Sequence, residues 1–160
     1  LKVSGKLNLK MGGPGFRDVS VIPNNGTTYY EPIYPIGSEY DRRTVYRFSP
    51  RGGRSAILDT FDCPDPSTTA PRRAVTTTPL QALALLNNKF ILNKADAMAN
   101  RLNAQSNGNR DKQVEQAFLS AFQRNPDSEE MLLAKRLIED YGLTTLCRSL
   151  FNSNEFIIIN

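Results

Sequence analysis

The chain has 160 residues, of which 39% are hydrophobic and 22% are charged, with a net charge of +4. It contains no histidine and only two cysteines, Cys63 and Cys147. These counts exclude Ser-His-Asp and Cys-His catalysis, the usual zinc sites and a C-x-x-C-H haem attachment in this chain. No apolar run approaches the ~20 residues of a membrane span, so we predict none.

The length fits one domain, and we predict a single domain over residues 1–160 with two unlike halves. Residues 1–77 form a loop-rich half, and residues 78–160 form a helical half. The chain begins at Leu1 rather than at a methionine, and its first residues lack the apolar stretch of a signal peptide. We therefore expect a fragment or processed piece of a larger protein.

The loop-rich half is punctuated by Gly, Pro, Asn, Ser and Thr, and nine of the ten prolines precede residue 80. The glycines of 12–15 predict a tight turn rather than a phosphate loop, because no Lys-Ser/Thr pair follows them. Pro32 and Pro35 argue against a central strand over 27–36, because proline cannot donate to a sheet. Residues 41–48 fit either a short helix or a strand, and periodicity over eight residues does not decide between them.

The helical half starts with a strong signal. Thr78 is predicted as the N-cap, Pro79 as the first helical residue and Gln81 as the return partner of a capping box. The helix weakens at 87–88, and its apolar pattern resumes from Phe90 and ends before residue 106.

A second apolar stripe begins near residue 111 and stops at 125–126. Asp127 and Glu130 form another predicted capping box, which opens a helix that ends at Gly142. The stripe resumes over 143–151, and the apolar tail at 156–159 is expected to dock on the helices. The predicted class is mainly α: an antiparallel bundle over residues ~78–152, with a long, irregular, Arg/Pro/Gly-rich N-terminal half packed on it.

The positive charge is concentrated in residues 41–73, which hold seven arginines, no lysine and four acids. A solvated surface has no need of arginine over lysine, whereas forked pairing with carboxylate, sulfate or phosphate favours arginine. Three interpretations follow: an internal network that pins the loops, an anionic glycan site, or a nucleic-acid surface helped by nearby tyrosines. The first is favoured. Nucleic acid is not expected, because +4 is a modest charge and local acids cancel much of it.

An anion site in this region would use charged and polar residues on both sides of the Pro-rich stretch: Arg42, Arg43, Asp62, Arg72, Arg73 and Gln81. No catalytic residue and no metal site is predicted. The spacing of Asp59, Asp62 and Asp65 resembles a calcium loop but lacks the glycine turn and distal glutamate. Whether the two cysteines are bridged stays open; Cys147 fits an ordinary buried apolar position.

Several runs, in this order along the chain, resemble the planctomycete PSD domain, domain-of-unknown-function family 1553. They are SGKLNLKMGGPGF from Ser4, RRTVYRFSPRGG from Arg42, FDCPDP from Phe61, RRAVTTTPLQALALLNN from Arg72, RNPDSEE from Arg124 and LCRSLFNSNEFIIIN from Leu146. The TTTPLQALALLN run is the most specific. The chain departs from the family at Asn88-Lys89, where Asp-Pro is frequent.

The resemblance implies a C-terminal domain of a multidomain, cytochrome-c-type envelope protein, periplasmic or secreted. Its partners would be the parent's other domains, including a cytochrome-c-like domain, and haem would be bound only there; no cofactor is expected in this chain. No catalytic residue transfers from the family. The expected function is therefore a non-catalytic structural or interaction module. The alternative is binding or processing of an anionic polysaccharide, sulfated or carboxylated, through the Arg42–Arg73 cluster.

Overall fold

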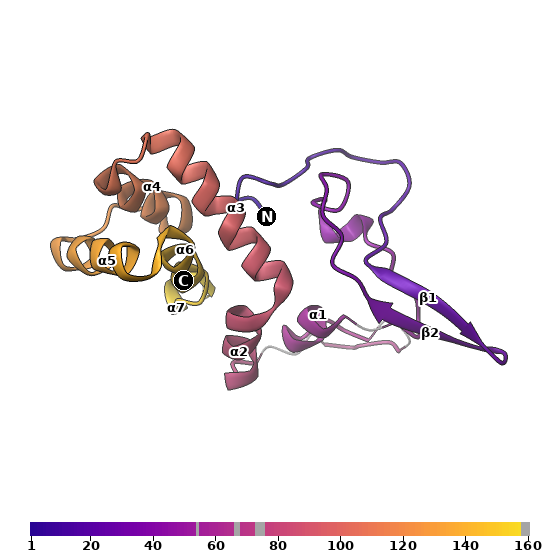
Figure 1. The fold of residues 1–160 in the computed structure, drawn as a ribbon. Coiled ribbons are helices and arrows are strands. Elements are labelled where there is room, and N and C mark those ends of the chain that lie inside the picture. The colour runs from indigo at the N-terminus through magenta and orange to yellow at the C-terminus, as the bar shows by residue number, and fades with distance from the viewer. Residues whose placement is uncertain (54, 66–67, 73–75, 158–160) are drawn as a thin grey trace. The chain divides into compact units, whose positions relative to one another are not determined.

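The computed structural model describes residues 1–53, 55–65, 68–72 and 76–157 (Figure 1). The chain divides into two compact units, one of Leu1–Lys6 with Leu85–Asn160 and the other of Leu7–Ala84. Most of its regular structure is helical, which confirms the predicted class. The first six residues belong with the helices, although the sequence placed all of 1–77 in the loop-rich half.

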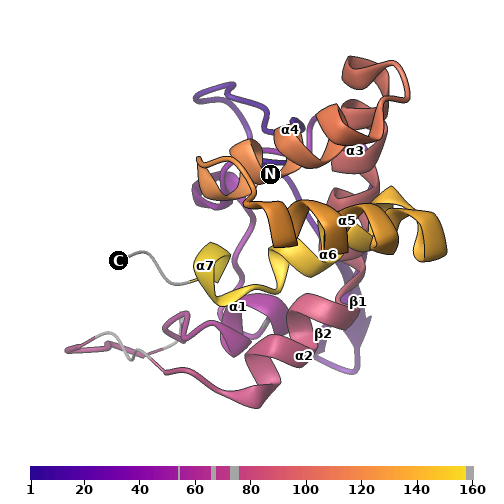
Figure 2. The ribbon, with the colours of Figure 1, turned by 90° about the vertical axis from the view of Figure 1, so that its left-hand side faces the viewer.

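The helical unit is a bundle built from successive amphipathic helices (Figures 1 and 2). Its elements are α3 (Lys89–Ser106), α4 (Arg110–Phe122), α5 (Ser128–Tyr141), α6 (Leu143–Phe151) and the short α7 (Asn154–Ile157). Helix α6 packs against α3, α4 and α5, and α4 also packs against α3 and α5. The side chains of Met98, Leu102, Val114 and Cys147 are completely buried between them. Burial of this shared apolar stripe is the main force that holds the bundle together.

Local signals set the helix ends as the sequence predicted. Helix α2 (Pro79–Asn87) stops before Asn88, whose side chain accepts a hydrogen bond from the Phe90 amide and so begins α3. Asn109 caps α4 in the same way, through the Lys112 amide. Gly142, with φ of 86°, lies between α5 and α6. Side chains that satisfy the free amides of a first turn explain why the chain breaks at these residues.

The second unit holds a β-hairpin that the sequence analysis did not assign. Strands β1 (Val19–Asn24) and β2 (Thr27–Pro32) pair antiparallel, with Val21 opposite Tyr30. The two-residue turn of Asn25 and Gly26 has positive φ at both positions, 43° and 83°, as a tight hairpin requires. Pro32 ends β2, and each strand has a single partner in this sheet, so neither is a central strand.

Residues 41–48 form neither a regular strand nor an α-helix. A 3-10 turn, η1 (Thr44–Tyr46), lies between two single β-bridges, which join Asn8 to Arg42 and Phe16 to Arg47. A short helix, α1 (Ala56–Thr60), follows without a side-chain hydrogen bond at its N-cap. No helix in the described part of the chain is long and apolar enough to cross a membrane.

Candidate functional site

Arg42 is the centre of the arginine region, and its side chain is turned inward. Only 6% of the residue is exposed. Its guanidinium donates hydrogen bonds to three backbone carbonyls: Nη1 to Pro14 at 2.8 Å, and Nη2 to Gly12 at 2.6 Å and Lys10 at 3.2 Å. The same group lies 4.1 Å from the centroid of the Tyr46 ring. Arg42 therefore acts as a cross-link that holds the 10–14 loop.

The glycines of this loop explain its sequence. Gly12 and Gly13 have φ of 70° and 75°, a region that residues with a Cβ rarely adopt. A Cβ on Gly15 would come within 2.7 Å of the Tyr46 carbonyl oxygen, at the bridge between Phe16 and Arg47. The Tyr46 hydroxyl accepts a hydrogen bond from the Gly12 amide. The glycines at 12, 13 and 15 thus allow the 10–14 loop to fold closely around the Arg42 guanidinium.

Arg47 makes a second internal tie, by which we mean a side-chain contact that joins distant parts of the chain. Its Nε donates to the Asp18 carboxylate at 2.7 Å, and its side chain is 7% exposed. Arg43 and Arg51, by contrast, are exposed. Adjacent arginines in the sequence therefore have different roles. Arg42 and Arg47 stand at the two β-bridges and contact other parts of the unit, whereas Arg43 is exposed to solvent.

A second cluster gathers around Asp62 and Gln81. The Asp62 carboxylate accepts hydrogen bonds from the Thr76 amide at 2.6 Å and from the Thr76 hydroxyl at 2.9 Å. The buried Gln81 amide donates from Nε2 to the Thr60 carbonyl at 3.1 Å and to the Thr76 hydroxyl at 3.3 Å. This Asp62–Thr76–Gln81 cluster joins the end of α1 to the start of α2.

Gln81 also completes the start of α2. Its Oε1 accepts from the Thr78 amide at 3.1 Å, and its own amide donates to the Thr78 hydroxyl at 3.4 Å, the reciprocal pair of a capping box. Arg72 is exposed and has no ion pair with a described residue, and the Asp62 carboxylate binds Thr76. Arg73 lies outside the described residues.

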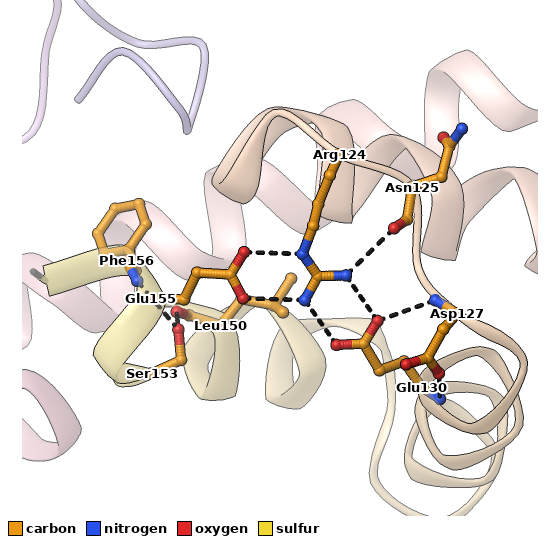
Figure 3. A network of polar contacts seen from close by, with 8 residues as sticks. All are labelled: Arg124, Asn125, Asp127, Glu130, Leu150, Ser153, Glu155 and Phe156. Atoms are coloured by element: carbon orange, nitrogen blue, oxygen red, sulfur yellow. Dashed lines mark hydrogen bonds and ion pairs between the residues drawn. The ribbon is translucent and has the colours of Figure 1, made fainter. Parts of the chain in front are cut away.

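The most complete polar network lies in the helical unit, around Arg124 (Figure 3). Arg124 uses all five N–H groups. It donates to Glu155 from Nε at 2.7 Å and Nη2 at 2.9 Å, to Glu130 from Nη1 at 2.7 Å and Nη2 at 2.6 Å, and to the Asn125 carbonyl at 3.1 Å. Its guanidinium also lies 5.6 Å from the Phe118 and Phe122 ring centroids. One side chain thus joins the end of α4, the start of α5 and α7.

This network shares a residue with the Asp127 cap. Glu130 Oε2 accepts from the Asp127 amide, and Asp127 accepts from the Glu130 amide, so the predicted box is present. Hydrogen bonds from Arg124 and from the Asp127 backbone lower the pKa of Glu130 to about 2. The same guanidinium lowers the pKa of Glu155. Both glutamates are therefore ionised at neutral pH.

Other reactive groups are few in the described chain. Cys63 and Cys147 are free thiols, and burial raises the pKa of Cys147 to about 12, which keeps it protonated and unreactive. Among the described residues no group of three or more cysteines and acids is placed to hold a metal ion. The hydrogen bonds described around Arg42, Asp62 and Arg124 do not pair a nucleophile with a base.

The structure brings together only some of the predicted site residues that it describes. Asp62 and Gln81 meet through Thr76, while Arg42 binds the 10–14 loop. Sequence reasoning identified Glu130 as a cap but missed Arg124 as the hub. A signal for this ion pair was present in the sequence. Arg124 and Glu155 lie in two of the runs that resemble the family, and they carry opposite charges.

The chain is therefore mainly helical, and the most extensive hydrogen-bond networks described, around Arg42 and Arg124, join parts of the chain to each other. A family profile, PSD1, described as "Protein of unknown function (DUF1553)", matches residues 1–138. The chain belongs to this family. Comparisons with curated proteins and with solved structures found no match.

Proposed function

We propose that the chain is a non-catalytic structural or interaction module of a larger, cytochrome-c-associated envelope protein, periplasmic or secreted. One observation carries the proposal: Arg42, Arg47 and Arg124 donate hydrogen bonds to the chain's own carbonyls and carboxylates. The absence of histidine from the sequence and the unreactive Cys147 thiol support it. The resemblance supplies the envelope setting and the cytochrome-c-like partner domain.

The haem part of this proposal has two direct tests. The gene from which the chain derives should encode a C-x-x-C-H segment upstream of Leu1, because haem attachment needs those cysteines and a histidine that this chain lacks. The purified 160-residue chain should show no Soret absorption after expression with active haem-attachment machinery. A stoichiometric haem bound by this chain, or a complete gene without that segment, would contradict the proposal.

A second candidate is binding of a sulfated polysaccharide by the exposed arginines of the loop-rich unit. Arg43, Arg51 and Arg72 are exposed, so their guanidinium groups are available for forked pairing with sulfate. A thermal-shift titration with a sulfated glycan tests it. The candidate requires a stabilisation that is lost in Arg72→Ala and in Arg73→Ala. A shift that survives both substitutions, or no shift, would contradict it.

A further inference from the structure

The helical unit carries an open hollow between α3 and α4 that none of the internal ties fills. Its volume is about 540 Å³, within the range of small-molecule sites. The lining side chains are one arginine, three glutamines, one serine and one leucine: Arg101, Gln105, Gln116, Leu119, Ser120 and Gln123. No acidic residue lines it.

Arg101 differs from Arg47 and Arg124, the half-buried arginines that pair with carboxylates. Its Nη2 donates to the Val3 carbonyl at 2.8 Å and to the Ser120 hydroxyl at 3.3 Å, and its Nη1 donates to Gln105 Oε1 at 3.2 Å. All three acceptors are neutral, and Arg101 makes no ion pair with any described residue. Its Nε is buried and has no acceptor within the described chain. The guanidinium of Arg101 therefore keeps one buried N–H without an acceptor, and no carboxylate of the described chain neutralises its charge.

The hollow is also held in shape before any ligand arrives. A Cβ on Gly5 would come within 2.7 Å of Arg101 Cδ, so the N-terminal turn fits closely against this side chain. The three hydrogen bonds of Arg101 then fix the guanidinium at the wall. At the other end, Gln123 Nε2 donates to the Leu119 carbonyl. Fixed polar groups lose little entropy when they bind a ligand.

The remaining groups indicate the chemistry of that ligand. The three side-chain amides carry both donors and acceptors, and the buried Gln116 Oε1 lacks a donor in the described structure. Amides of this kind match hydroxyl groups, which also donate and accept. Leu119 is 44% exposed and offers an apolar surface for C–H groups. A single positive charge among neutral groups suits one carboxylate better than a multiply charged phosphate.

We propose that this hollow binds a carboxylated sugar, with the carboxylate paired to Arg101 and the hydroxyls to the glutamine amides. The inference does not depend on the proposed function, and it concerns a different unit from the exposed arginines of the loop-rich unit. It assigns the α3–α4 face as a site for a uronic acid residue of an acidic glycan.

The test uses a matched pair of small probes. Methyl glucuronide and methyl glucoside, which differ at C6 in the carboxylate, are titrated into the millimolar range with the full ¹⁵N-labelled chain. The glucuronide should shift amide resonances at residues 101–105 and 116–123, and the glucoside should not. Arg101→Lys keeps the charge but loses the fork, and should weaken binding about tenfold. Gln116→Ala should weaken it by a smaller factor.

Arg136→Ala is the control, because Arg136 is an exposed arginine on α5. It should bind the glucuronide like the unmodified chain. Equal shifts with both probes, shifts unchanged by Arg101→Lys and Gln116→Ala, or no shifts at all would overturn the proposal. If Arg101→Lys lowers the melting temperature so far that it is unfolded during the titration, Gln116→Ala alone decides the outcome.

Discussion

Replacing Arg42 by methionine should destabilise the loop-rich unit. Methionine retains an apolar stem of similar reach but removes three charge-assisted hydrogen bonds, at 2.8, 3.2 and 2.6 Å, and the contact with Tyr46. Hydrogen bonds to charged groups each contribute about 1.5–3 kcal/mol to stability. Residues 10–14 are exposed, so water can replace part of this. The expected loss is about 3 kcal/mol in the free energy of unfolding.

The tyrosine distribution provides an assay for this unit. Five of the six tyrosines lie between residues 29 and 46, and the chain has no tryptophan. Tyrosine fluorescence during urea unfolding therefore reports mainly the loop-rich unit, while circular dichroism at 222 nm reports mainly the helices. Arg42→Met should lower the fluorescence midpoint and leave the main helical transition in place.

Arg43→Met is the matched control, since Arg43 is the adjacent arginine and its side chain is exposed. It should change stability by less than about 0.5 kcal/mol. If the two variants unfold at the same urea concentration, the cross-link interpretation of Arg42 is refuted. Arg42→Lys should fall between the unmodified chain and Arg42→Met, because an ammonium group cannot reproduce the fork.

Three further predictions concern single contacts. Thr78→Ala should cost about 1 kcal/mol of stability through loss of the N-cap, and an unchanged melting curve would mean that Thr78 does not cap α2. Gly5→Ala should lower the melting temperature, since the new Cβ meets Arg101 at 2.7 Å and φ is 75°; equal stability would show that the turn can shift. Because the folded pKa of Glu130 lies below its unfolded value of 4.5, its stabilisation is complete above pH 4.5 and is lost as pH falls toward about 2. Glu130→Gln should flatten that slope in acid-unfolding curves, and a slope equal to that of the unmodified chain would contradict the assignment.

The helical half could be predicted well because its signals are local. Amphipathic spacing, the Thr78 and Asp127 caps and the polar break at 87–88 all act within one or two turns of the chain. The hairpin was not assigned, although the turn residues Asn25 and Gly26 were visible. Pro32 and Pro35 argued only against a central strand, and the structure agrees, since Pro23 and Pro32 lie in strands with one partner each. Both strands tolerate these prolines because each has a single partner.

The candidate site was harder to predict because its contacts are distant in sequence. Arg42 binds carbonyls about thirty residues away, and every residue carries a carbonyl, so nothing in the sequence marks those acceptors. Arg124 and Glu155 are separated by 31 residues and meet only after α5 and α6 fold back. The arginine excess of residues 41–73 predicted forked pairing with an anion, but Arg42 binds backbone carbonyls and Arg47 meets Asp18 through Nε alone. Forked pairing with carboxylates occurs instead at Arg124, outside that stretch.

The most direct test of this distinction is the mobility of the guanidinium groups themselves. In ¹⁵N spectra of the full chain, hindered rotation should give separate, exchange-protected Nη–H resonances for Arg42 and Arg124, whose donors are held by internal acceptors. Arg43 and Arg72 should give averaged signals, as exposed side chains do. Averaged, unprotected signals for Arg42 and Arg124 would contradict the conclusion that these arginines are internal ties.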